Sequence, residues 1–300
     1  MTTSATGTPL RQDVEEPSAP RLPVRTVVKR AAGYSVLLMF AVIYIYPFLI
    51  QAATSFKTDE QASSDALSLR PDPFTTDAWL RLFDGSVPFA TWLGNSVLVT
   101  VCVTLGKVLF NSLAGYALSR LKFRGVNTLF MLVVAVLAVP GVVLLIPKFL
   151  VLQSLGIWNT YTAMIVPLLV DAAGIFIMKQ FFDSVPYSIE EAARIDGAGV
   201  IRTFWSIVLP MARPALITIT ILSFQGSWNE FTHFLVATQS PELNTLTRGL
   251  ANLTSGQLGS GNQFPLKLAA ALVATIPVAI MFVLLQRFFV TGANAGGEKG

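Results

Sequence analysis

Six long apolar runs dominate the sequence, and each is close to the length that crosses a lipid bilayer. A spanning helix needs about 20 residues, because each residue rises ~1.5 Å through a hydrocarbon core of ~30 Å. The runs cover approximately residues 32–53, 93–118, 127–146, 161–178, 215–235 and 268–286. Only 13% of the 300 residues are charged, whereas soluble proteins average about 25%. We therefore predict an all-α membrane protein with six transmembrane helices.

Basic residues outside the apolar runs fall on one side of a six-span topology. They precede the first run, separate the second from the third and the fourth from the fifth, and follow the last: Arg21, Arg25, Lys29, Arg30, Arg120, Lys122, Arg124, Arg194, Arg202, Arg213 and Arg287. The positive-inside rule assigns this side to the cytoplasm, so both termini are expected to be cytoplasmic. No basic stripe with interleaved aromatic residues remains, which argues against a nucleic-acid partner.

The composition at the two ends of the chain predicts tails around one membrane domain. Residues 1–24 are rich in Thr, Ser, Pro and charge, which is typical of a disordered tail. The first apolar run is too long for the apolar region of a signal peptide, so we interpret it as an uncleaved span. We expect a transmembrane domain over 25–292 and a flexible tail over 293–300.

A charged, amphipathic segment at 186–214 separates the fourth and fifth runs. Ser188 and Glu191 have the spacing of a capping box, Pro186 would stop a preceding helix, and Gly197 is expected at a C-cap and sharp bend. A second helical piece is expected to place these apolar residues on one side: Val200, Phe204, Ile207 and Val208. We predict a helix–bend–helix on the membrane face, a shape suited to docking another protein.

This segment resembles the EAA loop of ABC importer permeases. Glu191-Ala192-Ala193 is followed after three residues by Gly197 and after nine more by Ile207-Val208-Leu209-Pro210. In that family the loop is the coupling element, which inserts into a cleft on a cytoplasmic ATPase subunit. The alternative is an ordinary interfacial loop in which Glu191 only caps its helix.

The resemblance implies a set of coupling residues: Glu190, Glu191, Ala192, Ala193, Asp196, Gly197, Leu209 and Pro210. The charge of Glu191 would meet a basic ATPase residue, the small alanines would allow close approach, and Gly197 would permit the bend.

Six spans with this loop between the fourth and the fifth resemble the maltose-type, carbohydrate branch of these permeases. The resemblance implies a type I ABC importer permease fold in a prokaryotic cell membrane, importing a sugar by alternating access. The implied partners are a second EAA-bearing permease, two ATPase subunits and an extracytoplasmic sugar-binding protein. The segment 242–253 resembles the outer loop that reaches toward that binding protein.

The sequence encodes no catalytic or cofactor chemistry that we can identify. The pattern of a phosphate-cradling loop is missing, and one His and one Cys cannot build a zinc centre. We therefore expect no enzyme, no metal and no cofactor in this chain, with ATP and Mg²⁺ bound by the partner ATPase.

Two charged residues fall near the middle of apolar runs, Lys107 in the second and Asp171 in the fourth. A charge in the bilayer centre costs at least ~2.5 kcal/mol, so each is a candidate functional residue. We predict that the two side chains face the bundle interior and pair; the alternative is that Lys107 reaches water unpaired.

The segment Trp228-Asn229-Glu230-Phe231 resembles a W-N-E-[FY] segment common in the sugar-transporting branch. Polar groups beside aromatic rings suit a carbohydrate, so Trp228, Asn229 and Glu230 are candidate residues of the substrate path. The alternative is that they join neighbouring helices. Two further alternatives concern the whole chain: a permease for glycerol phosphate or another small polar solute, and an ion-coupled secondary transporter.

Overall fold

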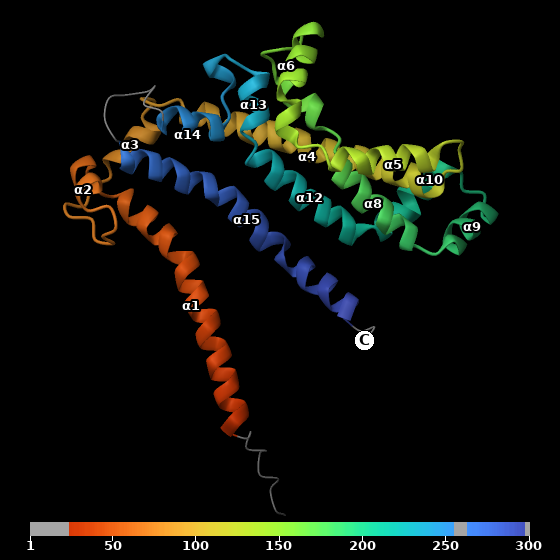
Figure 1. The fold of residues 1–300 in the computed structure, drawn as a ribbon, viewed down its shortest axis with the longest axis horizontal. Helices are drawn as coiled ribbons and strands as arrows, with labels where there is room; N and C mark the ends of the chain where they lie inside the picture. The colour runs from red at the N-terminus through yellow and green to blue at the C-terminus, as the bar shows by residue number, and fades with distance from the viewer. Residues whose placement is uncertain (1–23, 255–262, 298–300) are drawn as a thin grey trace, which may run out of the picture. The chain divides into compact units, whose positions relative to one another are not determined.

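The computed structural model describes residues 24–254 and 263–297 (Figure 1). Four helical segments are long and apolar enough to cross a membrane: Lys29–Thr54, Phe89–Arg120, Tyr161–Ser184 and Phe264–Gln286. Two bent pairs also qualify, Val126–Leu137 with Gly141–Ser154 at 100° and Val200–Met211 with Arg213–Trp228 at 80°. If each bent pair is one span, the described residues hold six spans. The all-α membrane fold is confirmed.

The chain divides into two compact units, residues 1–48 and 49–300. In the first unit, the part of α1 (Val24–Thr54) up to Phe48 is a continuous helix that exposes large apolar side chains from Tyr34 onward. The predicted tail over 1–24 lies outside the described residues except for Val24. At the other end, α15 (Phe264–Gly297) continues past the domain boundary expected at residue 292.

In the second unit, α4 (Phe89–Arg120) is the central helix, and it packs against α8 (Ala172–Ser184) and α12 (Arg213–Trp228). Small residues allow α4 and α8 to approach closely. A Cβ added to Gly115 would lie 2.7 Å from Met178 Cβ, and one added to Gly174 would lie 2.0 Å from Asn111 Nδ2. Gly115 therefore does not tolerate a side chain without separating the helices, and at Gly174 the Asn111 side chain would have to move.

Buried apolar side chains form three clusters along α4. One surrounds Trp92 and includes residues of α3 (Asp77–Phe83), α14 (Leu246–Thr254) and α15. A second joins α4 and α8 to Phe204, Val208 and α12. The third lies around Val99 and Val103 and includes α7 (Tyr161–Ile165) and α13 (Thr232–Ala237).

Three of the predicted spans are broken rather than continuous. The third consists of α5 (Val126–Leu137), a bend at Pro140 and Gly141, and then η1 (Gly141–Leu144) and α6 (Leu145–Ser154). The fourth is divided into α7, η2 (Val166–Leu168) and α8, because Asp171 caps α8 by accepting from Gly174 N at 2.6 Å.

The expectation of a continuous fifth span over 215–235 was wrong. Helix α12 ends at Trp228 and α13 starts at Thr232. Glu230 Oε1 accepts the backbone N–H of His233 at 2.7 Å, which satisfies a donor at the start of α13 and favours a new helix there.

The remaining short helices lie in the connections: α2 (Asp59–Ser64), α9 (Tyr187–Ile195), α10 (Val200–Thr203), a π-helical turn over Phe204–Val208, α11 (Leu209–Met211) and η4 (Pro241–Leu243). Within the second unit, α9 lies at the end of the bundle opposite α3 and α14 (Figure 1).

Candidate functional site

The loop at 186–214 contains the helix and bend that the sequence predicts. Helix α9 ends at Ile195, and Gly197 has φ +79°. Gly197 N donates to Arg194 O at 3.0 Å and Ala198 N donates to Ala193 O at 2.9 Å. These two bonds form a Schellman motif, which needs a left-handed residue at the position of Gly197. The bend is therefore fixed by the backbone of this glycine.

The predicted capping box at Ser188 and Glu191 was wrong. Helix α9 begins at Tyr187 with Pro186 as its N-cap, and no side chain caps it. Proline favours an earlier start because its fixed φ suits the boundary of a helix. Ser188 consequently lies inside the first turn, where its hydroxyl is not in the capping position.

The predicted coupling residues divide by exposure. Glu191, Ala192, Asp196 and Gly197 are exposed at the tip of the loop. By contrast, Glu190 is 0% and Ala193 4% exposed, so both side chains face the bundle. Further along, Leu209 is half-buried and Pro210 is exposed. Only part of the motif is thus available to a partner.

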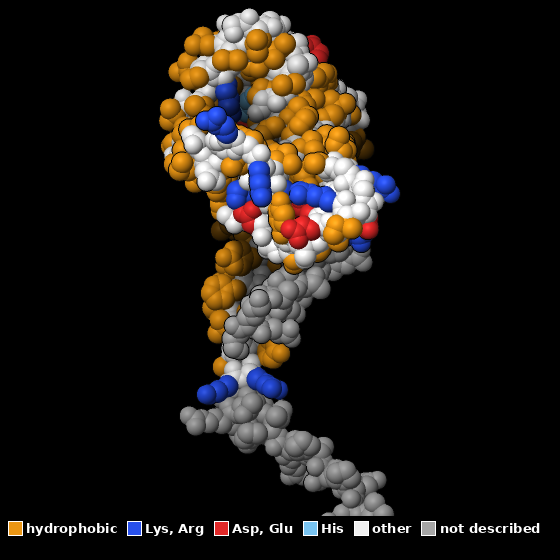
Figure 2. Space-filling view, turned by 90° about the vertical axis from the view of Figure 1, so that its right-hand side faces the viewer, with side chains coloured by type: hydrophobic (Ala, Val, Ile, Leu, Met, Phe, Trp, Pro, Cys, Tyr) orange, Lys and Arg blue, Asp and Glu red, His pale blue; other side chains and the backbone are white. Residues whose placement is uncertain are grey.

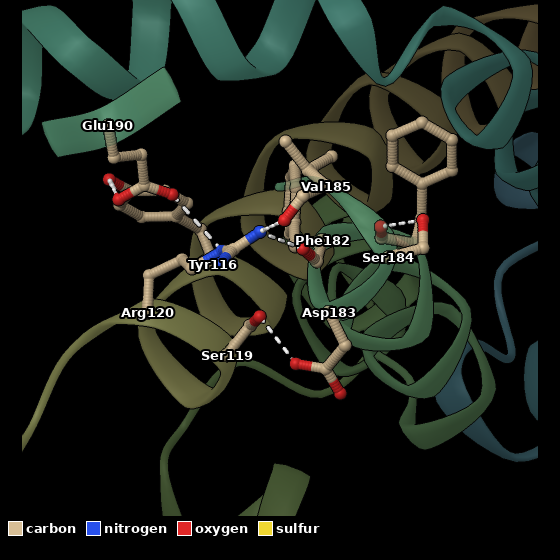
Figure 3. A network of polar contacts seen from close by, with 9 residues as sticks. Tyr116, Ser119, Arg120, Phe182, Asp183, Ser184, Val185 and Glu190 are labelled. Atoms are coloured by element: carbon tan, nitrogen blue, oxygen red, sulfur yellow. Dashed lines mark hydrogen bonds and ion pairs between the residues drawn. The ribbon is translucent and has the colours of Figure 1, made fainter. Parts of the chain in front are cut away.

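Glu190 is held by an ion pair with Arg120, the last residue of α4 (Figure 3). Arg120 Nε lies 3.1 Å from Glu190 Oε1, and the two side chains are 6% and 1% exposed. The Tyr116 hydroxyl donates to Glu190 Oε2 at 3.3 Å. Both charges are removed from water, and each compensates the other.

Arg120 also binds the end of α8. Its Nη2 donates to the carbonyl oxygens of Phe182, in the last turn of that helix, and of Val185, its C-cap residue. A cation suits this place because the final carbonyls of a helix carry partial negative charge. One guanidinium therefore joins α4, α8 and α9.

An aromatic cluster supports the same three-way junction. The ring centroid of Tyr116 lies 5.7 Å from that of Phe182 and 4.9 Å from that of Phe204. All three side chains are buried. Edge and tilted contacts of this kind stabilise the junction beyond the burial of apolar area. Because Glu190 precedes the bend and Phe204 follows it, the loop is attached on both sides of its bend.

The second helical piece differs in part from the prediction. Phe204 and Val208 are buried and Ile207 is half-buried, whereas Val200 is 49% exposed. Val200 is the first residue of α10 and lies before the π-helical turn at Phe204–Val208, and it does not share the buried face.

Sequence reasoning did not find several residues of this site. Ile195 and Ile201 are 87% and 76% exposed on either side of the bend. The sequence signal that could have found them is the presence of two large apolar residues within a charged loop. Tyr116 and Arg120 were also not recognised as part of the site, because nothing local indicates contact across 74 and 70 positions with Glu190.

Lys107 and Asp171 lie together inside the bundle. Lys107 Nζ is 3.0 Å from Asp171 Oδ2, with side chains 16% and 34% exposed. Asn111 Nδ2 donates to the same carboxylate oxygen at 3.4 Å. The pair borders a cavity of about 240 Å³ that Ser223 of α12 also lines.

The three candidate substrate-path residues occupy different environments. Trp228 is 4% exposed, stacks on Phe224 at 5.8 Å, and donates from Nε1 to Ala274 O at 3.0 Å. Glu230 binds the start of α13, as described above. Asn229 is exposed at the break after α12, so it is the member of the three most open to a solute.

The segment 242–253 is largely packed against the bundle. Asn95 Nδ2 donates to Glu242 O at 2.7 Å and Asn244 O at 2.9 Å, and Ser96 Oγ accepts from Leu246 N at 2.7 Å. Leu246 and Leu253 are 1% and 2% exposed. These contacts fix α14 on α4.

A bundle of apolar helices with a projecting charged loop is the architecture of a multi-pass membrane protein. Residues 108–293 match the family described as the binding-protein-dependent transport system inner membrane component, and the chain belongs to this family. It is a permease of the ABC importer class in the inner membrane. This finding overturns the alternative of an ion-coupled secondary transporter.

Curated relatives match nearly the whole chain. The permease protein of an arabinooligosaccharide transport system from Halalkalibacterium halodurans is 34% identical over 87% of this chain and 93% of its own length. A polygalacturonan/rhamnogalacturonan transport system permease protein from Bacillus subtilis is 37% identical, covering 89% and 96%. The sn-glycerol-3-phosphate transport system permease protein of Yersinia pestis is 29% identical, covering 85% and 92%.

A solved structure shares the fold. The crystal structure of a bacterial ABC transporter that imports the acidic polysaccharide alginate contains a chain with a TM-score of 0.76 and 24% identity. The match covers 90% of this chain and all of that one.

Proposed function

We propose that this permease imports a carbohydrate, with a di- or oligosaccharide as the expected solute. The proposal is supported by the curated relatives, of which several belong to transport systems for arabinooligosaccharides, galactooligosaccharides and polygalacturonan. Asn229 is the residue that we propose for contact with the solute, because it is exposed where α12 ends.

We propose a complex with a second EAA-bearing permease, two ATPase subunits and an extracytoplasmic solute-binding protein. ATP and Mg²⁺ would be held by the ATPase subunits, and this chain would hold no cofactor. A crystal structure of an alginate transporter in complex with a periplasmic protein supports the arrangement, because one of its chains matches 87% of this one with a TM-score of 0.61.

The observation that carries the coupling proposal is the division of α9 into two faces. One face presents Glu191, Ala192 and Ile195 to solvent, and the other attaches Glu190 to Arg120. A movement of the ATPase would therefore be transmitted through α9 to the ends of α4 and α8. Alternating access would follow as those helices tilt.

A second candidate solute is glycerol phosphate. The relative from Yersinia pestis that belongs to an sn-glycerol-3-phosphate transport system supports it, at somewhat lower identity. The two candidates differ in charge, so they need different polar groups in the path.

Uptake by the purified complex, reconstituted with its binding protein in liposomes, tests the function. We expect ATP-dependent accumulation of a labelled oligosaccharide and none of labelled glycerol phosphate. Accumulation of glycerol phosphate and not of the oligosaccharide would favour the second candidate. Accumulation of either solute without ATP would contradict the proposal of an ATP-driven importer.

A further inference from the structure

A hollow of about 580 Å³ lies beside the coupling loop. Residues that follow α4, the start of α5, Lys179 of α8 and Tyr187 of α9 line it. Four of the lining side chains are cationic and none is acidic: Arg120, Lys122, Arg124 and Lys179. The hollow is therefore suited to an anion.

Two of these four charges are not compensated within the described part of the chain. Arg120 pairs with Glu190, and Lys179 Nζ lies 2.6 Å from Asp183 Oδ2. Lys122 and Arg124 are exposed, and neither makes an ion pair with any described residue. The hollow thus retains a positive charge of about two, which attracts phosphate groups.

The backbone at the start of α5 adds to this attraction. Gly125 is the N-cap of that 12-residue helix, has φ +88°, and offers no side chain to the N–H groups of the first turn. Val126 and Asn127 of this turn line the hollow. The N-terminus of a helix carries partial positive charge, so it supplements Lys122 and Arg124.

An apolar surface continues directly from the cations. Leu121 and Phe123, which alternate with Lys122 and Arg124, are 37% and 43% exposed. Helix α5 has no buried residue, and Leu132 is 59% exposed. Figure 2 looks onto this end of the molecule and shows Lys and Arg side chains spread among apolar ones. A ligand that fits both features has an anionic head and apolar tails.

We propose that this hollow binds the headgroup of an anionic phospholipid. Its phosphate contacts Lys122 and Arg124, and its acyl chains lie along α5. Basic pockets at the membrane surface recognise such headgroups. The proposal depends on the chain spanning a membrane and is independent of which solute it carries.

The test is lipid binding by the purified, delipidated complex, measured by native mass spectrometry with phosphatidylglycerol and with phosphatidylcholine. The Lys122→Gln/Arg124→Gln variant removes the two uncompensated charges. Arg70→Gln/Lys148→Gln removes one Arg and one Lys that do not line the hollow. Lys122→Arg/Arg124→Lys keeps both charges, so it separates the loss of charge from the exchange of the side chains.

We expect wild type to bind phosphatidylglycerol in preference to phosphatidylcholine, and the Lys122→Gln/Arg124→Gln variant to bind it at least about tenfold more weakly. The control and the charge-preserving variants should match wild type. Equal binding by both Gln double variants would overturn the proposal. A second measurement compares the thermal stabilisation of the complex by inorganic phosphate and by phosphatidylglycerol. Equal stabilisation by the two would also overturn the proposal, because the site would then take a free anion.

Discussion

Arg120 Nε and Glu190 Oε1 lie 3.1 Å apart at the end of the bundle, with both side chains almost wholly buried. The contact joins the last residue of α4 to the loop helix α9, although the two residues are 70 positions apart. Arg120 also binds the carbonyls that end α8. We interpret this junction as the attachment through which α9 moves with α4 and α8.

Removal of one member of this pair should destabilise the protein strongly. Glu190→Ala would leave the Arg120 charge buried without its partner, which costs about 3–5 kcal/mol. Thermal unfolding of the purified complex in detergent measures the loss. The double variant Arg120→Met/Glu190→Leu should be more stable than Glu190→Ala, because no unpaired charge remains. Equal stability of Glu190→Ala and wild type would contradict the attachment.

A β-branched residue at Gly197 should uncouple ATP hydrolysis from transport. A Cβ at this position would meet no atom within 4 Å, so the penalty comes from the φ of +79° and not from a clash. Gly197→Val forces the bend to change, whereas Gly197→Asn should be tolerated because Asn adopts left-handed conformations. ATPase activity and uptake are measured together in liposomes. Normal uptake by Gly197→Val would show that the bend is not required.

The exposed apolar side chain of Ile195 should bind the partner ATPase. Ile195→Ser should reduce recovery of the ATPase with the tagged permease by at least about tenfold, as expected for a buried interface anchor. Because Ile195 is 87% exposed, the stability of the permease itself should not change. Leu67→Ser, at a residue 69% exposed in the first connection, is the matched control. Full recovery with Ile195→Ser would exclude this residue from the interface.

Lys107 and Asp171 should show energetic coupling in a double-mutant cycle. Lys107→Met and Asp171→Asn each remove one charge, and Asn at position 171 can still cap α8. We expect each single variant to be less stable and the double variant to recover about 1 kcal/mol relative to the sum. Strict additivity in thermal unfolding would mean that the pair does not hold α4 and α8 together.

The sequence predicts the elements of this fold better than their breaks. Long apolar runs locate the spans because the hydrocarbon core of a bilayer demands helices with apolar side chains. The starts of α8 and α13 were missed, because Asp171 and Glu230 favour them through hydrogen bonds from amides three residues away. The same Asp171 was nonetheless recognised as unusual, because a charge within a span is costly.

The coupling loop shows a similar limit. The spacing of Glu191 and Gly197 located the helix and its bend, and the two hydrogen bonds of the Schellman motif lie at the predicted bend. The burial of Glu190 could not be predicted, because its two partners lie on α4 and no local pattern links them. Motif position therefore does not distinguish a residue that faces a partner from one that attaches the loop.

The most direct test of the account is quantitative recovery of the ATPase subunit with the tagged permease and its Glu191→Lys variant. Glu60→Lys, which reverses an exposed carboxylate on α2, is the matched control. The account predicts that wild type and Glu60→Lys retain the ATPase and that Glu191→Lys loses most of it while remaining folded. Equal recovery with all three proteins would contradict the assignment of α9 as the coupling surface.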